Sequence, residues 1–339
     1  MKKILLFTIV FNFISCTNDN DDNYTKTINH VVGERRQQFN SNPTPEDYEK
    51  IGNSNFMKDL EDLKNLRNVN TSHTSKTTAE SWIRSTTPDP AFRAKLISIG
   101  AGREDGVIGD NYIEINANLT YLDISNAGIT DITGLANFKK LIQLNCSFNE
   151  IPVLPTSRMP LLQILECQNN KITGIDITKL KELRQLWAQN NLLTTVDFPE
   201  APNLWGVWLY GNQINQLNVH SWGSQYGWEA QNTAITELFI QDNLLTTFDF
   251  TSLINLSQTN VSSNRFITLN FDSNTKLKSL WCYSNSSLID LSIKNGFNSN
   301  IYGQDFSSNI KAPKIHVDAS FLPIANTAWP LKGSSTYIL

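Results

Sequence analysis

Three observations predict that this chain folds as a solenoid, a coil of short parallel strands stacked one on the next. Seven asparagines recur every 21 residues, with one longer step of 31. They are Asn149, Asn170, Asn191, Asn212, Asn243, Asn264 and Asn285. Each closes one pattern, with apolar residues at positions 1, 4 and 6, asparagine at position 9 and an apolar residue at position 11. A second apolar pair around a polar residue then follows, as in Val196, Asp197 and Phe198. A period of this length is typical of repeats that each form one strand and its return segment.

The first nine positions of each repeat predict a strand followed by a sharp turn. Neighbouring side chains of a strand point to opposite faces, so Leu165 and Cys167 point inward while Glu166 points outward. The turn leaves peptide groups without strand partners, and an inward asparagine carries the donors and the acceptor that these groups need. Removing one such asparagine should leave buried polar groups unpaired, at a cost of about 1–3 kcal/mol.

The pattern resembles that of leucine-rich repeat proteins. A first repeat starts at Leu119, with Ala127 in place of the asparagine, and a degenerate last repeat starts at Ile301. The full repeats start at Leu141, Leu162, Leu183, Leu204, Ile235, Leu256 and Leu277. The resemblance implies a leucine-rich repeat solenoid with a parallel β-sheet on its concave face. The short apolar pairs on the return side favour extended segments there over long helices.

The repeats occupy residues 119–310, with an insertion near residues 220–230, and we expect both ends of the array to be closed. An open end of a solenoid would expose apolar surface and an unpaired strand edge. Residues 88–118 predict an N-terminal cap, with a short helix over residues 88–97. Residues 311–339 resemble the C-terminal cap of bacterial arrays of this kind, and we expect Trp329 there and Trp205 in the repeats to pack rather than to bind.

The first part of the array carries a narrower resemblance. Residues 88–135, with the motif Gly-Ile-Thr-Asp-Ile-Thr-Gly-Leu at residues 128–135, resemble the cap and first repeat of internalin-like leucine-rich repeat proteins from Bacteroidetes-type bacteria. The loop at residues 103–110 has carboxylates near glycine, which would suit calcium. The alternating Asp and Asn residues of an EF-hand loop are absent there, so we expect no metal.

The N-terminal segment predicts export and a lipid anchor. Residues 1–15 have a basic start and a short apolar run, as in a signal peptide, and Ser15 followed by Cys16 resembles the lipobox of bacterial lipoproteins. The alternative is an ordinary cleaved signal. The acidic residues 17–22 resemble a surface-export signal, and residues 16–87 are polar enough to predict a flexible tether that contains one short helix. We therefore expect a lipid-anchored protein on the bacterial outer membrane, exposed at the cell surface.

Composition and missing motifs exclude several functions. A net charge of −4 and a pI of about 5.6 give no basic stripe for nucleic acid. Cys146, Cys167 and Cys282 all stand at the inward sixth position, where a small core group is expected, although a disulfide between the first two is an alternative. The sequence has no nucleophile elbow, phosphate loop or zinc-binding pair, so we expect neither an enzyme nor a cofactor.

The outward side chains of the strands are the candidate site. Aromatic and amide side chains gather there, and basic residues are missing from these positions. The candidate contacts on the strands are Trp187, Trp208, Tyr210, Phe239, Gln241, Trp281 and Tyr283, and those in the insertion are Trp222, Tyr226 and Trp228. Because adjacent strands lie roughly 4.8 Å apart, Trp187, Trp208 and Phe239 are expected to form one contiguous exposed strip.

Two functions remain open at this stage. Exposed aromatic rings among neutral amides suit a protein or glycan ligand, as in a surface-tethered, adhesin-like recognition module. The alternative is a structural or assembly protein of the cell envelope that uses the same face as a permanent interface. The rings can also serve only to stack along the sheet, each cross-strand pair adding about 0.2–1 kcal/mol.

Overall fold

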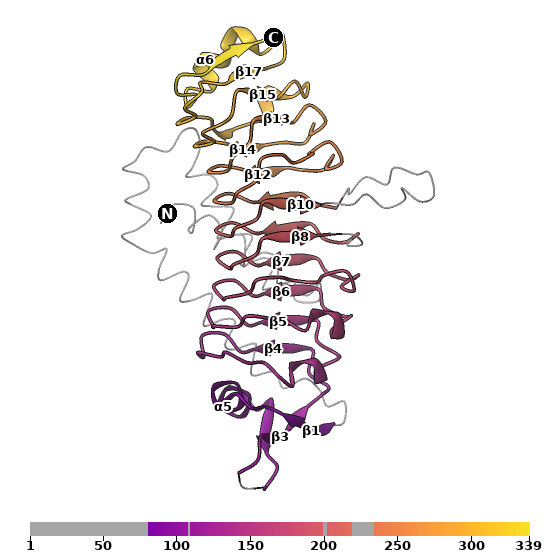
Figure 1. Cartoon of the computed structure of the whole chain (residues 1–339). Coiled ribbons are helices and arrows are strands. Elements are labelled where there is room, and N and C mark those ends of the chain that lie inside the picture. The colour runs from indigo at the N-terminus through magenta and orange to yellow at the C-terminus, as the bar shows by residue number, and fades with distance from the viewer. Residues whose placement is uncertain (1–80, 108, 199–201, 219–233) are drawn as a thin grey trace, which may run out of the picture. The chain divides into compact units, whose positions relative to one another are not determined.

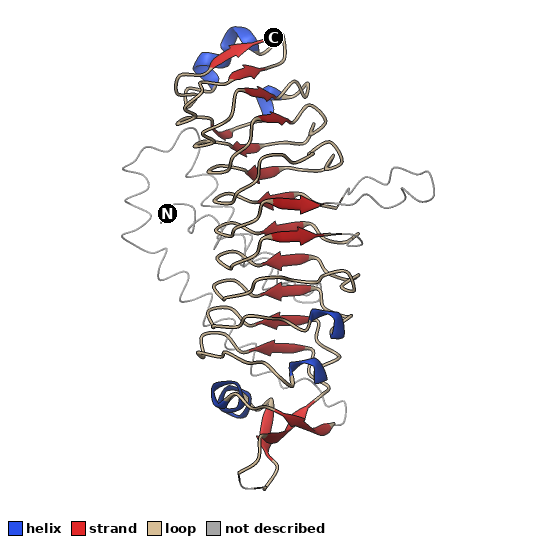
Figure 2. Cartoon of the chain, in the orientation of Figure 1, coloured by secondary structure: helices blue, strands red, loops and turns tan. Residues whose placement is uncertain are grey.

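The computed structural model describes residues 81–107, 109–198, 202–218 and 234–339. Within the compact unit that runs from Ala79 to Leu339, successive repeats stack one above another (Figure 1). Each repeat contributes one short strand to the same long sheet, and loops make up most of the return path (Figure 2). No helix of the described residues is both long and apolar enough to span a bilayer.

The main sheet has nine parallel strands, and it confirms the predicted fold class. In spatial order they are β4 (Tyr121–Asp123), β5 (Gln143–Asn145), β6 (Ile164–Glu166), β7 (Gln185–Trp187), β9 (Gly206–Trp208), β11 (Glu237–Phe239), β12 (Gln258–Asn260), β14 (Ser279–Trp281) and β16 (Gly303–Asp305). Equivalent positions pair in register, so Leu165 lies beside Leu144 on one side and Leu186 on the other. These three leucines face the hydrophobic core, and the opposite side of the sheet is the concave face.

The asparagine ladder is confirmed as a set of buried hydrogen bonds. The Oδ1 of Asn170 accepts from the backbone N–H of Ile151 at 2.9 Å, and its Nδ2 donates to the carbonyls of Cys146 at 3.0 Å and Cys167 at 3.1 Å. One side chain therefore ties its own turn to the turn of the preceding repeat. The residue before it, Asn169, has a positive φ of 56°, which gives the sharp turn that creates these unpaired peptide groups.

The return side is extended, as predicted, but it forms two separate sheets. Strands β8 (Thr195–Asp197) and β10 (Gln216–Asn218) pair with each other. Strands β13 (Thr268–Asn270), β15 (Asp290–Ser292), β17 (Lys314–His316) and β18 (Thr336–Ile338) form the second sheet. The apolar pairs at 175–177 and 248–250 were also predicted to be extended, and neither segment is a strand. One repeat before residues 175–177, the 3₁₀ turn η2 (Thr156–Arg158) begins at the end of the equivalent segment, and one repeat after them lies β8.

The N-terminal cap joins a short helix to a small antiparallel sheet. Helix α5 (Pro90–Ser98) matches the predicted helix, and Asp89 caps it by accepting from the N–H of Phe92 at 2.9 Å. Asp89 also accepts from the N–H and the hydroxyl of Thr130, both at 2.8 Å, and so ties the cap to the first repeat. The sheet consists of β1 (Trp82–Thr86), β3 (Tyr112–Asn116) and β2 (Gly102–Glu104). The cap thus begins before residue 88, and placing the end of the tether at residue 87 was wrong.

The carboxylates of the loop at residues 103–110 are held by arginines. Arg84 pairs with Asp105 at 2.7 Å and also with Asp110, and Arg93 pairs with Glu104. These pairs account for the acidic side chains that suggested calcium. In the described part of the chain no group of three or more metal-ligating side chains comes together.

The C-terminal cap closes the other end around one tryptophan. Trp329 is 2% exposed, packs against Phe306 and Phe321, and donates its indole N–H to the carbonyl of Ile301 at 3.1 Å. The prediction that Trp329 packs is therefore confirmed. The remaining short elements are η1 (Leu135–Asn137), η4 (Asn298–Asn300), η5 (Leu322–Ile324) and α6 (Ala325–Ala328).

The three cysteines of the repeats are free and buried, so the disulfide alternative for Cys146 and Cys167 is wrong. All three belong to the hydrophobic core, as their inward position predicted. Burial raises the pKa of each of these thiols far above its usual range. They therefore act as small apolar groups, in the place that leucine or isoleucine takes in other repeats.

Candidate functional site on the concave face

An aromatic row crosses three adjacent strands of the concave face. Trp187 on β7 and Trp208 on β9 are paired in register, and their rings stack with centroids 3.6 Å apart and planes 6° apart. Phe239 on β11 lies parallel to Trp208, with centroids 6.2 Å apart. The row lies outside the hydrophobic core, which takes Leu186 and Val207 from the same strands. The predicted contiguity of the three rings is confirmed.

The predicted exposure of this row is wrong for two of its rings. Trp187 is 3% exposed and Trp208 is 2% exposed, whereas Phe239 is half-buried. The ring of Trp208 lies down along its own strand over Gly206, where an added Cβ would stand 2.5 Å from the ring. Trp187 and Phe239 cover its two faces, and Trp205 meets it edge-on at 6.2 Å. The rings therefore shield one another instead of standing out from the sheet.

The other predicted contacts are not part of this stack. Trp281 and Tyr283 are half-buried on and after β14, and Asn260 of β12 separates Trp281 from Phe239 in register. Tyr210 is half-buried after β9. The site thus has an aromatic centre on β7, β9 and β11, with single aromatic rings beyond it. The remaining candidates, Trp222, Tyr226, Trp228 and Cys16, lie outside the described residues.

Two buried polar side chains flank Phe239 on β11 and its continuation. Glu237 is 8% exposed and makes no hydrogen bond or ion pair with any described residue, and desolvation by burial raises its pKa to about 7. Gln241 is 1% exposed, and its side-chain oxygen has no donor. Sequence reasoning included Gln241 among the contacts but passed over Glu237. The signal for Glu237 was present, because it is the one acidic residue at the third position of any repeat.

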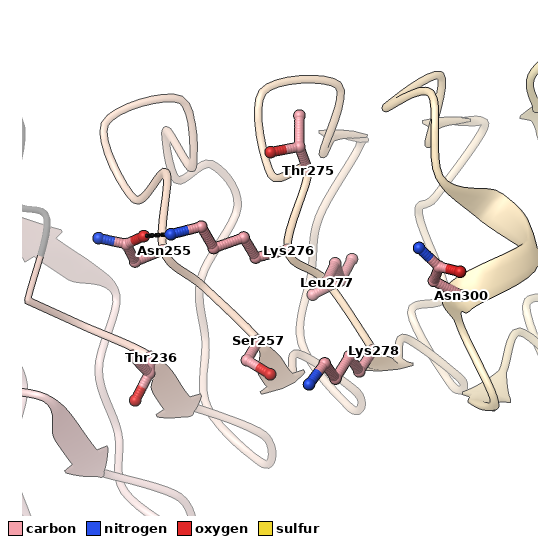
Figure 3. Close-up of a pocket in the computed structure, with 8 residues that line it drawn as sticks. All are labelled: Thr236, Asn255, Ser257, Thr275, Lys276, Leu277, Lys278 and Asn300. Atoms are coloured by element: carbon pink, nitrogen blue, oxygen red, sulfur yellow. Dashed lines mark hydrogen bonds between the residues drawn. The ribbon is translucent and has the colours of Figure 1, made fainter.

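Two depressions lie elsewhere on the solenoid. One of about 390 Å³ is lined by Thr236, Asn255, Ser257, Thr275, Lys276, Leu277, Lys278 and Asn300 (Figure 3). It lies ahead of strands β11, β12 and β14, and Lys276 crosses it to Asn255. The other, of about 730 Å³, lies on the return side between β10 and β13. Both are lined mainly by small polar side chains, and neither includes a buried charged group or a ring stack.

Comparisons with known proteins were made by sequence and by structure. No protein-family model matches the sequence, and no curated protein matches it. The functional domain of InlJ from Listeria monocytogenes is 20% identical, with a TM-score of 0.28 over 71% of this chain and 68% of that chain. Internalin C2 from Listeria monocytogenes is 21% identical, with a TM-score of 0.43 over 67% of this chain and 99% of that chain. YopM from Yersinia enterocolitica is 22% identical, with a TM-score of 0.41 over 56% and 47%.

These TM-scores are low, so the assignment of the fold rests on the repeat geometry of this chain. In-register parallel strands, one per repeat, together with a buried asparagine that bridges successive turns, define a leucine-rich repeat fold.

Proposed function

We propose that this chain is a recognition module that binds a protein or glycan ligand through the concave face of its leucine-rich repeats. The observation that carries the proposal is the aromatic row of Trp187, Trp208 and Phe239, which lies outside the core on a sheet held rigid by the asparagine ladder. Rigid elements place contacts precisely enough for recognition at low cost in conformational entropy. Phe239, Tyr210 and Trp281 keep part of their rings accessible and are the aromatic contacts of this proposal.

A structural or assembly role in the cell envelope is the second candidate. The shielding of Trp187 and Trp208 favours it, because rings that already cover one another offer a ligand less new surface to bury. In that case the stack stabilises the sheet, and the accessible rings belong to a permanent interface. The two candidate functions differ in the stability of the complex: a ligand should dissociate from the purified protein, whereas an assembly partner should stay bound.

The location that fits either function is the outer membrane, with a lipid anchor on Cys16 and the repeats at the cell surface. This part of the proposal is supported by residues 1–22 of the sequence alone. Metabolic labelling with a palmitate analogue tests it, with Cys16→Ala as the variant that should lose the label. Protease treatment of intact cells then tests exposure: cleavage of the protein without lysis is expected, and full protection would contradict surface display.

The binding function is tested with the full chain and two sets of variants. Phe239→Ala and Tyr210→Ala remove accessible rings of the concave face, and Tyr302→Ala removes a ring that is 75% exposed beside the last strand of the sheet. Each is screened on a glycan array and in pull-downs from cells, with circular dichroism and mass measured in parallel. Loss of ligand in the first two variants with fold and mass unchanged supports recognition. Equal capture by all three would refute it, and loss of a stably co-purifying partner would favour the assembly role.

A further inference from the structure

The carboxyl of Glu237 is buried and has neither a hydrogen-bond donor nor a cation beside it among the described residues. It points outward from β11, where its in-register neighbours are Gly206 of β9 and Gln258 of β12. With 8% of its surface exposed it has lost most of its hydration, yet it forms no hydrogen bond or ion pair with any residue that the structure describes. Buried carboxylates in proteins are normally paired with a cation or several hydrogen-bond donors. The partner that Glu237 needs must therefore come from outside the described residues.

Gln241, on the same segment, also has a buried side-chain oxygen that lacks a hydrogen-bond donor. It lies four residues after Glu237, so both side chains point to the same face with Phe239 between them. Gln241 is 1% exposed and its side-chain oxygen accepts no hydrogen bond. One segment thus presents two hydrogen-bond acceptors, one of them acidic, and neither has a donor in the described part of the chain.

The surroundings of these acceptors favour a positive charge. The outward residues of the adjacent strands, Trp208 on β9 and Asn260 on β12, carry no charge, so nothing on these strands neutralises Glu237. The half-buried ring of Phe239 lies within the same patch, and the face of an aromatic ring attracts cations. A carboxylate beside an aromatic ring matches a lysine ammonium or an arginine guanidinium, which carry donors and no acceptor.

We propose that Glu237, beside Phe239, is the acceptor site for a basic side chain of a protein partner, and that Gln241, further along the same segment, accepts a second donor of that partner. This inference rests on the proposed binding function and narrows its ligand from a protein or glycan to a protein that presents lysine or arginine. A neutral glycan can donate hydroxyl groups to the same acceptors, but its binding would not depend on the charge of Glu237.

The test uses peptides selected from a displayed random library against the full chain, keeping those whose binding Phe239→Ala weakens. Their affinities are then measured by calorimetry for the wild type, for Glu237→Gln and for Glu182→Gln, which removes an exposed carboxyl outside the strands. We expect the kept peptides to be enriched in lysine and arginine. Glu237→Gln should weaken them by about 10- to 100-fold, the usual effect of losing a charge-assisted hydrogen bond, and Glu182→Gln should leave their affinity unchanged.

Each other outcome overturns a defined part of the argument. Peptides that depend on Phe239 but bind Glu237→Gln as well as the wild type would overturn the basic-side-chain inference and leave the concave-face proposal standing. The basic-side-chain inference would also be overturned if a peptide bound the wild-type protein equally well after its basic residue was replaced with glutamine. A library that yields no peptide dependent on Phe239 would overturn the basic-side-chain inference, and the concave-face proposal would then depend on the glycan array alone.

Discussion

The carboxyl of Glu237 should make the free protein less stable as the pH rises. Burial raises its pKa from 4.5 to about 7, with desolvation of the charged form as the cause. A carboxyl whose pKa is raised in the folded state costs the folded state nothing while it is protonated in both states. Its ionisation in the unfolded chain above pH 4.5 then progressively penalises the folded state, until the penalty is complete above about pH 7.

The size of the effect follows from the shift. A difference of about 2.5 pKa units, at 1.36 kcal/mol per unit, corresponds to about 3 kcal/mol. Glu237→Gln keeps the shape of the side chain and removes its ionisation. The variant should therefore be more stable than the wild type by about 3 kcal/mol at pH 8, and the difference should shrink to near zero at pH 4.

Denaturant unfolding at several pH values measures this difference. Tryptophan fluorescence is a suitable signal, because Trp208 lies on the strand next to Glu237 and reports on that part of the solenoid. Glu182→Gln serves as the matched control, since it removes the same chemical group from an exposed position. The reasoning is refuted if the wild type and Glu237→Gln differ by the same amount at pH 4 and pH 8.

Three further perturbations test the architecture. Asn243→Ala should lower the free energy of unfolding by about 1–3 kcal/mol, because it leaves the buried N–H of Ile214 unpaired and removes one of the two asparagine donors from the carbonyls of Leu209 and Ile240, whereas the exposed Asn215→Ala should cost little; thermal melts compare them. Gly206→Ala should push the ring of Trp208 off the strand and weaken the coupled tryptophan signal in circular dichroism, and an unchanged spectrum would contradict the stacked geometry. Burial alone would raise the pKa of Asp89, but hydrogen bonds from the backbone and a threonine hydroxyl hold it at about 2. Ionised Asp89 contributes about 2 kcal/mol above pH 3.8, and this part is lost as the pH falls towards 2, so Asp89→Ala should destabilise the protein by about 2 kcal/mol more at pH 7 than at pH 2.

Sequence reasoning was reliable wherever a repeat imposed the structure. The ladder asparagines and the inward apolar residues recur at one period, so each position was supported by several others. The strand at residues 82–86 had no such support, because its partner β3 lies about 30 residues later and pairs antiparallel to it. The apolar pair at residues 175–177 follows the same pattern and yet forms no strand, although β8 lies at the equivalent place in the next repeat.

The chemistry of the concave face depends on neighbours that the sequence does not place side by side. The alternation of side chains along a strand correctly predicted that Trp208 lies on the outward face. It did not predict that the ring lies flat along the strand, which is possible because Gly206 has no side chain and leaves room for the ring. From the sequence alone, Glu237 is expected to be an ordinary solvated carboxylate on the outward face of its strand. The structure shows it to be a buried carboxyl with no partner within the described ranges.

A leucine-rich repeat solenoid can tolerate such a group. Each turn is stabilised by its own core leucines and by asparagine bonds to the next turn, so the penalty at Glu237 is local to one strand and its neighbours. A destabilising carboxyl in a position that contributes nothing to the core is the pattern expected when a site is kept for binding at the expense of stability. If Glu237→Gln both stabilises the free chain and weakens binding of the basic peptide, Glu237 accounts for the loss of stability as well as for the affinity. If the variant is stabilised and binds unchanged, the buried carboxyl has another purpose and the basic partner is excluded.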